Sequence, residues 1–310
     1  MKAVQFSKYG GVDVLEVKDV PKPTPSSGQV LVEVKAVSIN PFDWKVREGY
    51  VKDHMPLDLP ITIGGDFAGV VADAGDSDYK VGDEVYGQAA AYGGGSGAFA
   101  EFAAASTGKI AAKPTNINFE EAAAIPLAGQ SALQALQDDI KLEKGQKILI
   151  HGGAGGIGSL AVQIAKAMGV YVIATAASDD LDYVKGLGTD EVIDYEAEDF
   201  TKKVKDVDAV FNTADQETAD KSLTVVKKGG VVASMTGEPD PKLAKKLGVK
   251  GIAMSTNGDT AKLEKLKNLI ENGEVKPQVD KVFSLDEVKE AFTHQEKGHP
   301  RGKVVLSVGD

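Results

Sequence analysis

The sequence predicts an α/β protein in which a doubly wound parallel sheet accompanies a β-rich part. Strand and helix patterns alternate from Lys147 onward, as they do in a parallel sheet that is covered by helices on both faces. A glycine-rich turn at residues 152–158 joins the first of these strands to a helix. The first third of the chain instead carries short apolar strands between turn residues.

Length, charge and cysteine content exclude several classes of protein. The chain has 310 residues, 42% of them hydrophobic, which is enough for two packed domains. Its formal net charge of −11 argues against a nucleic acid or a membrane surface as a partner. The absence of cysteine excludes disulfides, thiolate nucleophiles and thiolate metal ligands. Because the sequence shows no apolar segment of signal-peptide or membrane-span length, we expect a cytoplasmic protein.

The β-rich part is predicted to hold several short strands and a loop. Strands are expected at residues 30–37, 69–72, 82–87 and 98–102. Residues 92–97 are rich in glycine and are expected to form a loop. A helix is expected to begin near Asn118, because Glu121 follows it at the spacing of a capping box.

The alternating part is predicted to supply six strands, after which the chain returns to the first part. The six strands are expected at residues 147–151, 170–175, 191–194, 208–212, 230–234 and 251–254. A short strand, a helix near residues 285–294 and a final strand at 303–308 follow Lys276. This tail is too short for a core of its own, so we infer that it rejoins the β-rich part. The predicted domains are 1–117 together with 277–310, and an inserted domain at 118–276.

The glycine turn predicts a dinucleotide site. Gly153, Gly155 and Gly158 follow the pattern G-x-G-x-x-G between a strand and a helix. One glycine permits a tight turn, one lets a pyrophosphate approach the backbone, and one lets helix and strand pack closely. Glycine-rich turns also occur in ordinary strand–helix connections, but the flanking elements and the dipole of the following helix favour phosphate. The predicted pyrophosphate-binding residues are Gly153, Ala154, Gly155, Gly156, Ile157 and Gly158.

The end of the second strand favours NADP over NAD. NAD enzymes of this kind usually place an acidic side chain there, which holds the ribose 2′-hydroxyl. Ala177 stands at this point, and the hydroxyl of Ser178 is a candidate ligand of a 2′-phosphate. Asp179, Asp180 and the lack of an adjacent Arg or Lys count against NADP. Alternatively, Ser178 caps a helix whose first turn holds the two aspartates, and both interpretations can hold together.

Five motifs occur in the order of a known superfamily. They are SINPFDWK at 38–45, GGDFAGVV at 64–71, VGDEVYG at 81–87, PLAGQSA at 126–132 and RGKVVL at 301–306. Along nearly its whole length the chain resembles the medium-chain dehydrogenase/reductase superfamily, and within it the zinc-free quinone oxidoreductase (zeta-crystallin-like) branch. The resemblance implies a Rossmann sheet inserted into a β-rich, GroES-like catalytic domain, and a homodimer.

The chain departs from the zinc alcohol dehydrogenases of the same superfamily at their metal ligands. Asn40 stands at the position of the first ligand, a cysteine, and Gly65 at that of the histidine in a Gly-His-Glu motif. The structural zinc loop with its four cysteines is missing. A catalytic zinc needs about three protein ligands, so we expect no metal. The four scattered histidines are expected to be surface or packing residues.

The chemistry is therefore expected to depend on the nicotinamide, while the protein supplies binding, orientation and electrostatics. The resemblance implies NADPH-dependent reduction of a quinone or of an α,β-unsaturated carbonyl compound. Hydride addition to such an acceptor places negative charge on an oxygen, which a neutral donor can stabilise. Asn40 is the predicted donor, although an asparagine before a proline more often only forms a turn. Tyr50 is predicted to line the substrate pocket or donate a proton; alternatively it is an aromatic residue at the rim.

The resemblance also implies further contacts with the cofactor. Ser131 is expected near the nicotinamide, and Tyr195 near the adenosine phosphate. Polar ends of two strands are expected at the cofactor, because open α/β sheets bind ligands at that edge. These residues are Asn212, Thr213, Met235 and Thr236. Arg301 and Lys303 either reach the cofactor or form a solvated pair at the start of the last strand.

The function we expect is that of an NADPH-dependent quinone reductase acting on a small conjugated molecule. One alternative is an alkenal or enoyl reductase, which needs the same hydride donor and differs in the shape of its pocket. The other is a non-catalytic NADPH-binding protein, which needs the glycine turn but not Asn40.

Overall fold

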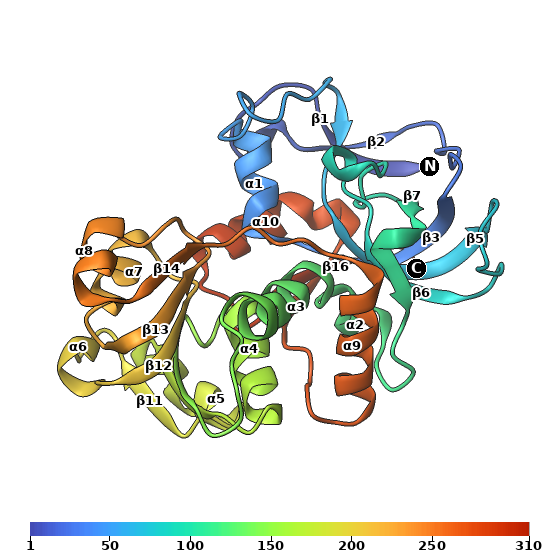
Figure 1. The fold of residues 1–310 in the computed structure, drawn as a ribbon. Coiled ribbons are helices and arrows are strands. Elements are labelled where there is room, and N and C mark those ends of the chain that lie inside the picture. The colour runs from blue at the N-terminus through green and yellow to red at the C-terminus, as the bar shows by residue number, and fades with distance from the viewer. Residues whose placement is uncertain (310) are drawn as a thin grey trace. The chain divides into compact units, whose positions relative to one another are not determined.

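The computed structural model describes residues 1–309, which form two compact units (Figure 1). Unit 1 comprises Met1–Leu127, Gly258–Glu271 and Pro277–Asp310, and unit 2 comprises Ala128–Asn257 and Asn272–Lys276. The predicted α/β class, with a parallel sheet in one part and β-rich structure in the other, is confirmed. The predicted domain boundaries stay a prediction, because compact units need not coincide with domains.

The six-stranded sheet of unit 2 is parallel throughout, in the order β11-β10-β9-β12-β13-β14. Its strands are β9 Lys147–His151, β10 Tyr171–Ala176, β11 Glu191–Asp194, β12 Val207–Asn212, β13 Val226–Ser234 and β14 Lys250–Ala253. The first of these six strands along the chain, β9, lies inside the sheet, and the strand order reverses between β9 and β12. This reversal is the topological switch point at which open α/β sheets bind their ligands.

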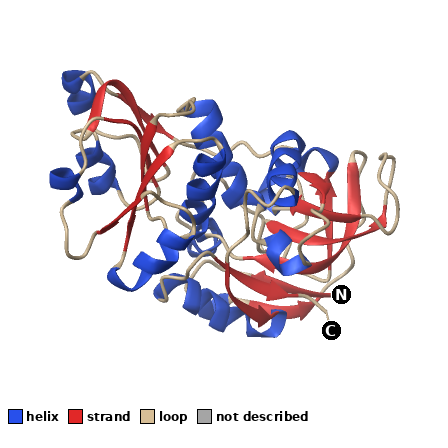
Figure 2. Cartoon of the chain, turned by 90° about the horizontal axis from the view of Figure 1, so that it is seen from below, coloured by secondary structure: helices blue, strands red, loops and turns tan. Residues whose placement is uncertain are grey.

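Helices cover both faces of this sheet (Figure 2). They are α4 Gly156–Ala167, α5 Leu181–Gly186, α6 Phe200–Lys203, α7 Gln216–Ser222 and α8 Pro241–Leu247. Helices α4 and α5 pack on β9, β10 and β11, whereas α7 and α8 pack on β12, β13 and β14. Another helix, α3 Pro126–Leu133, continues into a π-helical segment at Gln134–Asp139. None of the helices in residues 1–309 has the length and apolar character needed to cross a lipid bilayer.

Unit 1 is built on a seven-stranded sheet in which β3 is the central partner. The path β15-β16-β3-β5-β6-β8 is joined by β7, which also pairs with β3. These strands are β3 Gln29–Ser38, β5 Asp66–Asp73, β6 Glu84–Gln88, β7 Phe102–Ser106, β8 Ile110–Ala112, β15 Val279–Ser284 and β16 Lys303–Ser307. A small sheet in the order β2-β1-β4 completes the strands, with β1 Lys2–Phe6, β2 Glu16–Asp19 and β4 Ile61–Thr62. The C-terminal strand β16 therefore pairs with β3 near the N-terminus.

One predicted strand of unit 1 is wrong in position. Residues 98–101 form no strand: they pair with β1 only as an isolated bridge between Ala3 and Ala100, and strand β7 begins at Phe102. Four further helices belong to this unit: α1 Pro41–Glu48, α2 Phe119–Ala123, α9 Thr260–Glu271 and α10 Val288–Lys297. Short 3₁₀ turns lie at Val12–Val14, Ala91–Gly93, Thr107–Lys109 and Leu285–Glu287.

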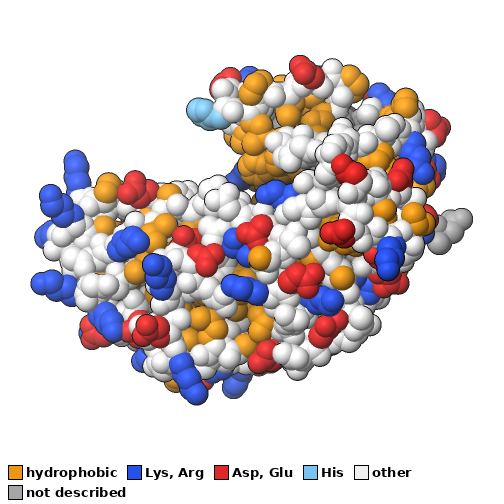
Figure 3. Space-filling view, turned by 45° about the vertical axis from the view of Figure 1, so that its right-hand side comes forward, with side chains coloured by type: hydrophobic (Ala, Val, Ile, Leu, Met, Phe, Trp, Pro, Cys, Tyr) orange, Lys and Arg blue, Asp and Glu red, His pale blue; other side chains and the backbone are white. Residues whose placement is uncertain are grey.

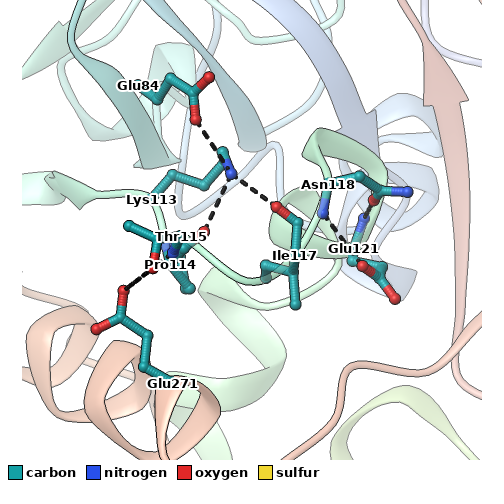
Figure 4. Close-up of polar contacts among 8 residues, drawn as sticks. All are labelled: Glu84, Lys113, Pro114, Thr115, Ile117, Asn118, Glu121 and Glu271. Carbon is teal, nitrogen blue, oxygen red and sulfur yellow. Dashed lines mark hydrogen bonds and ion pairs between the residues drawn. The ribbon is translucent and has the colours of Figure 1, made fainter.

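The predicted start of a helix at Asn118 is confirmed (Figure 4). The Glu121 N–H donates to Asn118 Oδ1 at 2.8 Å, and the Asn118 N–H donates to the Glu121 carboxylate at 3.1 Å. Just before it, the buried ammonium of Lys113 donates to the carbonyl oxygens of Pro114 and Ile117, at 3.0 and 2.7 Å. These bonds fix the connection from β8 to α2.

Helix α1 is anchored by one buried guanidinium, that of Arg47, whose side chain is fully buried. It donates to the Gly10 carbonyl at 3.1 Å and to the carboxylates of Glu296 and Glu48 at 2.9 and 2.7 Å. Glu296 lies on α10, so Arg47 ties α1 to α10. Because α1 begins directly after Asn40, this anchor also sets the position of that residue.

Replacing Arg47 by alanine is expected to lower the free energy of unfolding by about 3 kcal/mol, because the change leaves buried acceptors and carboxylates without their cation. Urea titration of the variant measures this loss. Lys45→Ala, an exposed change on the same helix, is the control and should stay within about 0.5 kcal/mol of the parent. Equal losses in the two variants would contradict the anchoring role.

Candidate functional site

Four buried residues of unit 1, Asn40, Asp43, Asp66 and Lys303, form a buried polar cluster. Lys303 opens β16, Asn40 follows β3 and Asp66 opens β5, which are adjacent strands of one sheet. Their register places Ser38 opposite Asp66 on one side and opposite Val305 on the other. Residues distant in sequence therefore meet at one end of these three strands.

A chain of hydrogen bonds runs through the buried polar cluster. The ammonium of Lys303 donates to Asn40 Oδ1 at 2.5 Å and to the Ile39 carbonyl at 2.6 Å. At the other end of the amide, Asn40 Nδ2 donates to Asp66 Oδ2 at 3.0 Å. The Asp66 carboxylate also accepts from Gln88 Nε2 at 2.9 Å and from the Leu127 N–H at 3.0 Å. The amide of Asn40 is thus held with its oxygen toward a cation and its nitrogen toward an anion.

Burial shifts the protonation of all three ionisable members. It raises the pKa of Asp43 to about 7, the charge of Asp66 adding to the effect, although the Asn40 N–H donates to this carboxylate at 2.7 Å. Burial also raises the pKa of Asp66, against the opposing charge of Lys303, and lowers the pKa of Lys303, against the two carboxylates. The ammonium of Lys303 stabilises both carboxylates, which repel each other, in an interior that disfavours each charge alone.

The fixed amide of Asn40 can act as a neutral hydrogen-bond donor. Its Nδ2 carries two hydrogens, and Asp66 is its one hydrogen-bond acceptor among residues 1–309. By contrast, Tyr50 is 70% exposed, and its ring meets the edge of Trp44 at a centroid distance of 5.7 Å. The predicted catalytic role of Tyr50 stays a prediction, and the ring is more exposed than the partly buried aromatic residue at the rim that was its alternative.

A side chain at position 65, where the resemblance would place a zinc-binding histidine, would lie near the phenol of Tyr92. A β-carbon added to Gly65 would stand 3.4 Å from the Ala90 methyl group and 3.7 Å from Tyr92 Oη. Residues 1–309 hold no group of three or more His, Asp or Glu side chains suited to a metal ion. Sequence reasoning missed Tyr92, because a glycine-rich loop gave no sign that its tyrosine turns toward the buried polar cluster.

The glycine turn of unit 2 has the geometry of a phosphate cradle. Gly152 adopts a left-handed φ of +73°, and the Gly153 N–H donates to the Thr175 carbonyl on β10 at 2.9 Å. A β-carbon at Gly158 would lie 2.0 Å from the Gly152 oxygen, whereas one at Gly155 meets nothing closer than 3.5 Å. Gly158 thus lets α4 pack on the turn, and Gly155 leaves open space above the backbone.

Helix α4 begins on this turn without a side-chain cap. Its N-cap is Gly155, and no side chain accepts from the first N–H groups of the helix. Those donors and the helix dipole form a site for an anion. The open space at Gly155 and the uncapped helix fit the pyrophosphate of a dinucleotide, which residues 153–158 would hold.

Ser178, the predicted ligand of a 2′-phosphate, is hydrogen-bonded to acidic side chains. Ser178 Oγ donates to Asp194 Oδ2 at 2.6 Å, and its N–H donates to the Glu196 carboxylate at 3.0 Å. The hydrogen bond from Ser178 lowers the pKa of Asp194. The alternative in which Ser178 caps a helix is wrong, because the cap of the turn Ser178–Asp180 is Ala177. Tyr195, next to Asp194, is exposed.

Other predicted cofactor residues gather at the carboxyl edge of the sheet. The Met235 N–H donates to the Asn212 carbonyl at 3.0 Å, and Asn212 Nδ2 donates to Thr236 Oγ1 at 3.2 Å. Thr213 Oγ1 donates to the carbonyl of His151, just before the glycine turn, at 2.7 Å. The ends of β9, β12 and β13 are thereby joined. Ser131 is fully buried on α3, 2.7 Å from Thr256 Oγ1.

Arg301 and Lys303, from the motif at residues 301–306, lie in unit 1. Lys303 is buried in the cluster with Asn40, so its predicted alternative as a solvated pair with Arg301 is wrong. The Arg301 N–H donates to Asp280 Oδ1 at 3.1 Å. Contact of either side chain with the cofactor stays a prediction, as do the other cofactor contacts.

His151 is a buried neutral imidazole beside the glycine turn. Its ring nitrogens lie 3.1 Å from Thr175 Oγ1 and 3.1 Å from Ser222 Oγ. Burial lowers the pKa of His151 to about 4, with a small opposing effect of Asp215. This residue is a packing histidine, as the sequence predicts.

Comparison with known proteins gives matches over nearly the whole of this chain. Two family descriptions apply: "Zinc-binding dehydrogenase" over residues 187–306 and "Alcohol dehydrogenase GroES-like domain" over residues 26–115. The 2-methylene-furan-3-one reductase of Solanum lycopersicum is 39% identical, over 99% of this chain and 79% of its own. The chloroplastic NADPH-dependent alkenal/one oxidoreductase of Arabidopsis thaliana is 40% identical, with the same coverage. The structure of the quinone oxidoreductase from Coxiella burnetii superposes with a TM-score of 0.90, at 32% identity over 100% of this chain and 99% of that one.

Two glycine substitutions should separate packing from ligand binding. Gly158→Ala is expected to lower Tm by several degrees, because its β-carbon meets the Gly152 oxygen. Gly155→Ala should leave Tm nearly unchanged but raise the Kd for NADPH by on the order of tenfold, about 1.4 kcal/mol. Calorimetry with and without NADPH measures both quantities. Unchanged affinity in a folded Gly155→Ala protein would refute the assignment of the open space to the pyrophosphate.

The buried imidazole predicts a particular loss of stability in acid. Between pH 6.5 and about 4 the unfolded chain binds a proton on His151 that the folded chain does not, so the free energy of unfolding falls as the pH falls through this range. In His151→Gln this contribution is absent and the decline should be shallower. Urea unfolding of both proteins from pH 7.5 to 4.5 measures the difference, and parallel curves would show that the imidazole is not buried as described.

Proposed function

Because the chain belongs to the medium-chain dehydrogenase/reductase superfamily, in its zinc-free quinone oxidoreductase branch, we propose that it is an NADPH-dependent reductase of α,β-unsaturated carbonyl compounds. It is an oxidoreductase of the quinone or alkenal type and uses a nicotinamide cofactor. The observation that carries the proposal is the amide of Asn40, fixed in a buried site with one N–H group left to donate.

The names of the relatives favour an enone or alkenal as the acceptor. Those at 39% and 40% identity are a 2-methylene-furan-3-one reductase and an alkenal/one oxidoreductase. A quinone, the acceptor first expected from the sequence, is the second candidate, supported by the solved quinone oxidoreductase at 32% identity. Both acceptors are conjugated carbonyl compounds, so the same donor serves both.

We propose NADPH as the preferred cofactor. Ala177 leaves the end of β10 without an acidic side chain of the kind that holds a ribose 2′-hydroxyl. For a 2′-phosphate to bind, Ser178 must exchange its bond to Asp194 for one to the phosphate. The name of the alkenal/one oxidoreductase also includes NADPH.

The side chains of the buried polar cluster would stabilise the charge that forms on the substrate. The bound nicotinamide supplies a hydride. The free N–H of Asn40 would hold the carbonyl oxygen of the acceptor, which gains negative charge as the hydride arrives. Lys303 and Asp66 keep this amide from rotating, so no reorganisation is needed during the reaction. The nearby ammonium adds a fixed positive charge behind the amide oxygen.

The proposed assembly is a homodimer, and its proposed partner is a small molecule. The sheet of unit 2 ends on β14, which pairs only with β13 among residues 1–309, so its outer edge is available to a second copy. Acidic and basic side chains are interspersed on the face shown in Figure 3, which suits a small neutral substrate better than a nucleic acid. The cytoplasmic location stays a prediction.

Steady-state kinetics with a small enone and with 1,4-benzoquinone, each with NADPH and NADH, tests the proposal. Asn40→Ala should lower kcat/KM by roughly 10²-fold, because one donor to the developing oxyanion is lost. Asn116→Ala, which removes an exposed amide elsewhere in unit 1, should match the parent. Binding of NADPH without turnover of any conjugated acceptor would instead favour the non-catalytic alternative.

A further inference from the structure

The carboxylate of Asp194 lies at the end of β10, where the sheet of unit 2 would receive an adenosine ribose. Strands β10 and β11 are parallel, and their register places Asp194 beside Ala176, the last residue of β10. NAD enzymes with this kind of sheet carry an acidic side chain at the end of the second strand, where it binds the ribose 2′-hydroxyl. Ala177 follows β10 here, and a carboxylate reaches the same place from β11 instead.

Hydrogen bonds from one hydroxyl and two N–H groups hold this carboxylate in place. Asp194 Oδ2 accepts from Ser178 Oγ at 2.6 Å. Asp194 Oδ1 accepts from the N–H groups of Glu196 and Ala197 at 2.9 and 3.3 Å. The bond from Ser178, together with those from the two N–H groups, lowers the pKa of Asp194, so the carboxyl group is ionised at neutral pH. A fixed negative charge therefore lies directly against Ser178, the predicted ligand of a 2′-phosphate.

The other surroundings of Ser178 are also acidic. The Glu196 carboxylate accepts from the Ser178 N–H at 3.0 Å. Asp179 and Asp180 follow directly in the chain. Lys185 is the only Lys or Arg from residue 169 to residue 201, the part of the sequence that contains both strands. Because a phosphate monoester carries about −1.5 to −2 charges at neutral pH, a 2′-phosphate would be repelled here, whereas a 2′-hydroxyl would find an acceptor.

We propose that Asp194 sets the choice between the two dinucleotides: its carboxylate accepts a hydrogen bond from the ribose 2′-hydroxyl of NADH and repels the 2′-phosphate of NADPH. The inference rests on the proposed function and deepens it, because it makes NADH a working cofactor and limits the proposed preference for NADPH. Ser178 and Asp194 act in opposite directions. The Ser178 hydroxyl donates to a phosphate only after leaving the Asp194 carboxylate, and that carboxylate then repels the phosphate at close range.

The variant Asp194→Asn tests the charge, because an amide oxygen can still accept from the two N–H groups that hold the carboxylate. The Kd for NADH divided by the Kd for NADPH should rise by on the order of tenfold over the parent, since the like charge beside the phosphate is gone. Calorimetry without an acceptor measures both affinities. Glu191→Gln is the matched control, because it removes the same charge at the other end of β11, where Glu191 accepts from the Tyr171 hydroxyl at 2.7 Å; its ratio should match the parent.

A second variant, Ser178→Ala, tests the same pair from its other side. It removes the hydroxyl that would bind the phosphate and leaves the carboxylate, so the same ratio should fall, by about three- to tenfold. A parental ratio in Asp194→Asn, or a shift in the same direction in both variants, overturns the inference.

These outcomes are separate from those that test the proposed function. The order of the two affinities in the parent tests the preference for NADPH, and turnover of a small enone or of 1,4-benzoquinone tests the reaction. If the parent binds NADH more tightly and the two variants still shift the ratio in opposite directions, the preference for NADPH fails while the role of Asp194 stands. If the parent binds neither dinucleotide, the proposed function fails and this inference fails with it.

Discussion

The buried ammonium of Lys303 is the constraint on which the site of unit 1 depends. Removing an ammonium from water costs several kcal/mol unless hydrogen bonds and opposite charges compensate it. Asn40, the Ile39 carbonyl and the carboxylates of Asp43 and Asp66 provide that compensation. They reach Lys303 only when β16, β3 and β5 hold their register, because a slip of one residue turns every side chain to the other face of the sheet. The last strand of the chain must therefore be in place before Asn40 acquires its fixed orientation.

Unit 2 depends on close packing instead of charge compensation. Gly158 lies so close to the Gly152 carbonyl that no side chain fits, and this approach brings the start of α4 onto the end of β9. Thr175 and Thr213 then tie the turn to the neighbouring strands through hydrogen bonds to residues 151–153. The cradle is thus rigid at its base and open at Gly155, the combination that a site for a large, flexible dinucleotide requires.

The sequence predicted much of this architecture because its signals are local. Apolar strands bounded by turn residues placed β9 and β11 at their observed bounds. Strand β13 begins at Val226, four residues earlier than predicted, because Lys227, Lys228 and two glycines resemble a turn. The partners of Asn40 could not be predicted, since Lys303 lies 263 residues away and meets it only through the pairing of β16 with β3. Tyr92 gave no local signal, and the exposure of Tyr50 depends on packing that sequence alone does not reveal.

A cofactor phosphate bound at the uncapped start of α4 would also raise the free energy of unfolding of the chain. A helix whose N-cap is Gly155 has no side chain to satisfy its first N–H groups, so a phosphate bound there, as proposed, would complete the helix. A ligand that binds only the folded state adds stability in proportion to the logarithm of its concentration, about 2.7 kcal/mol at a hundredfold excess over Kd. The folded chain would then be most resistant to unfolding when the dinucleotide is plentiful.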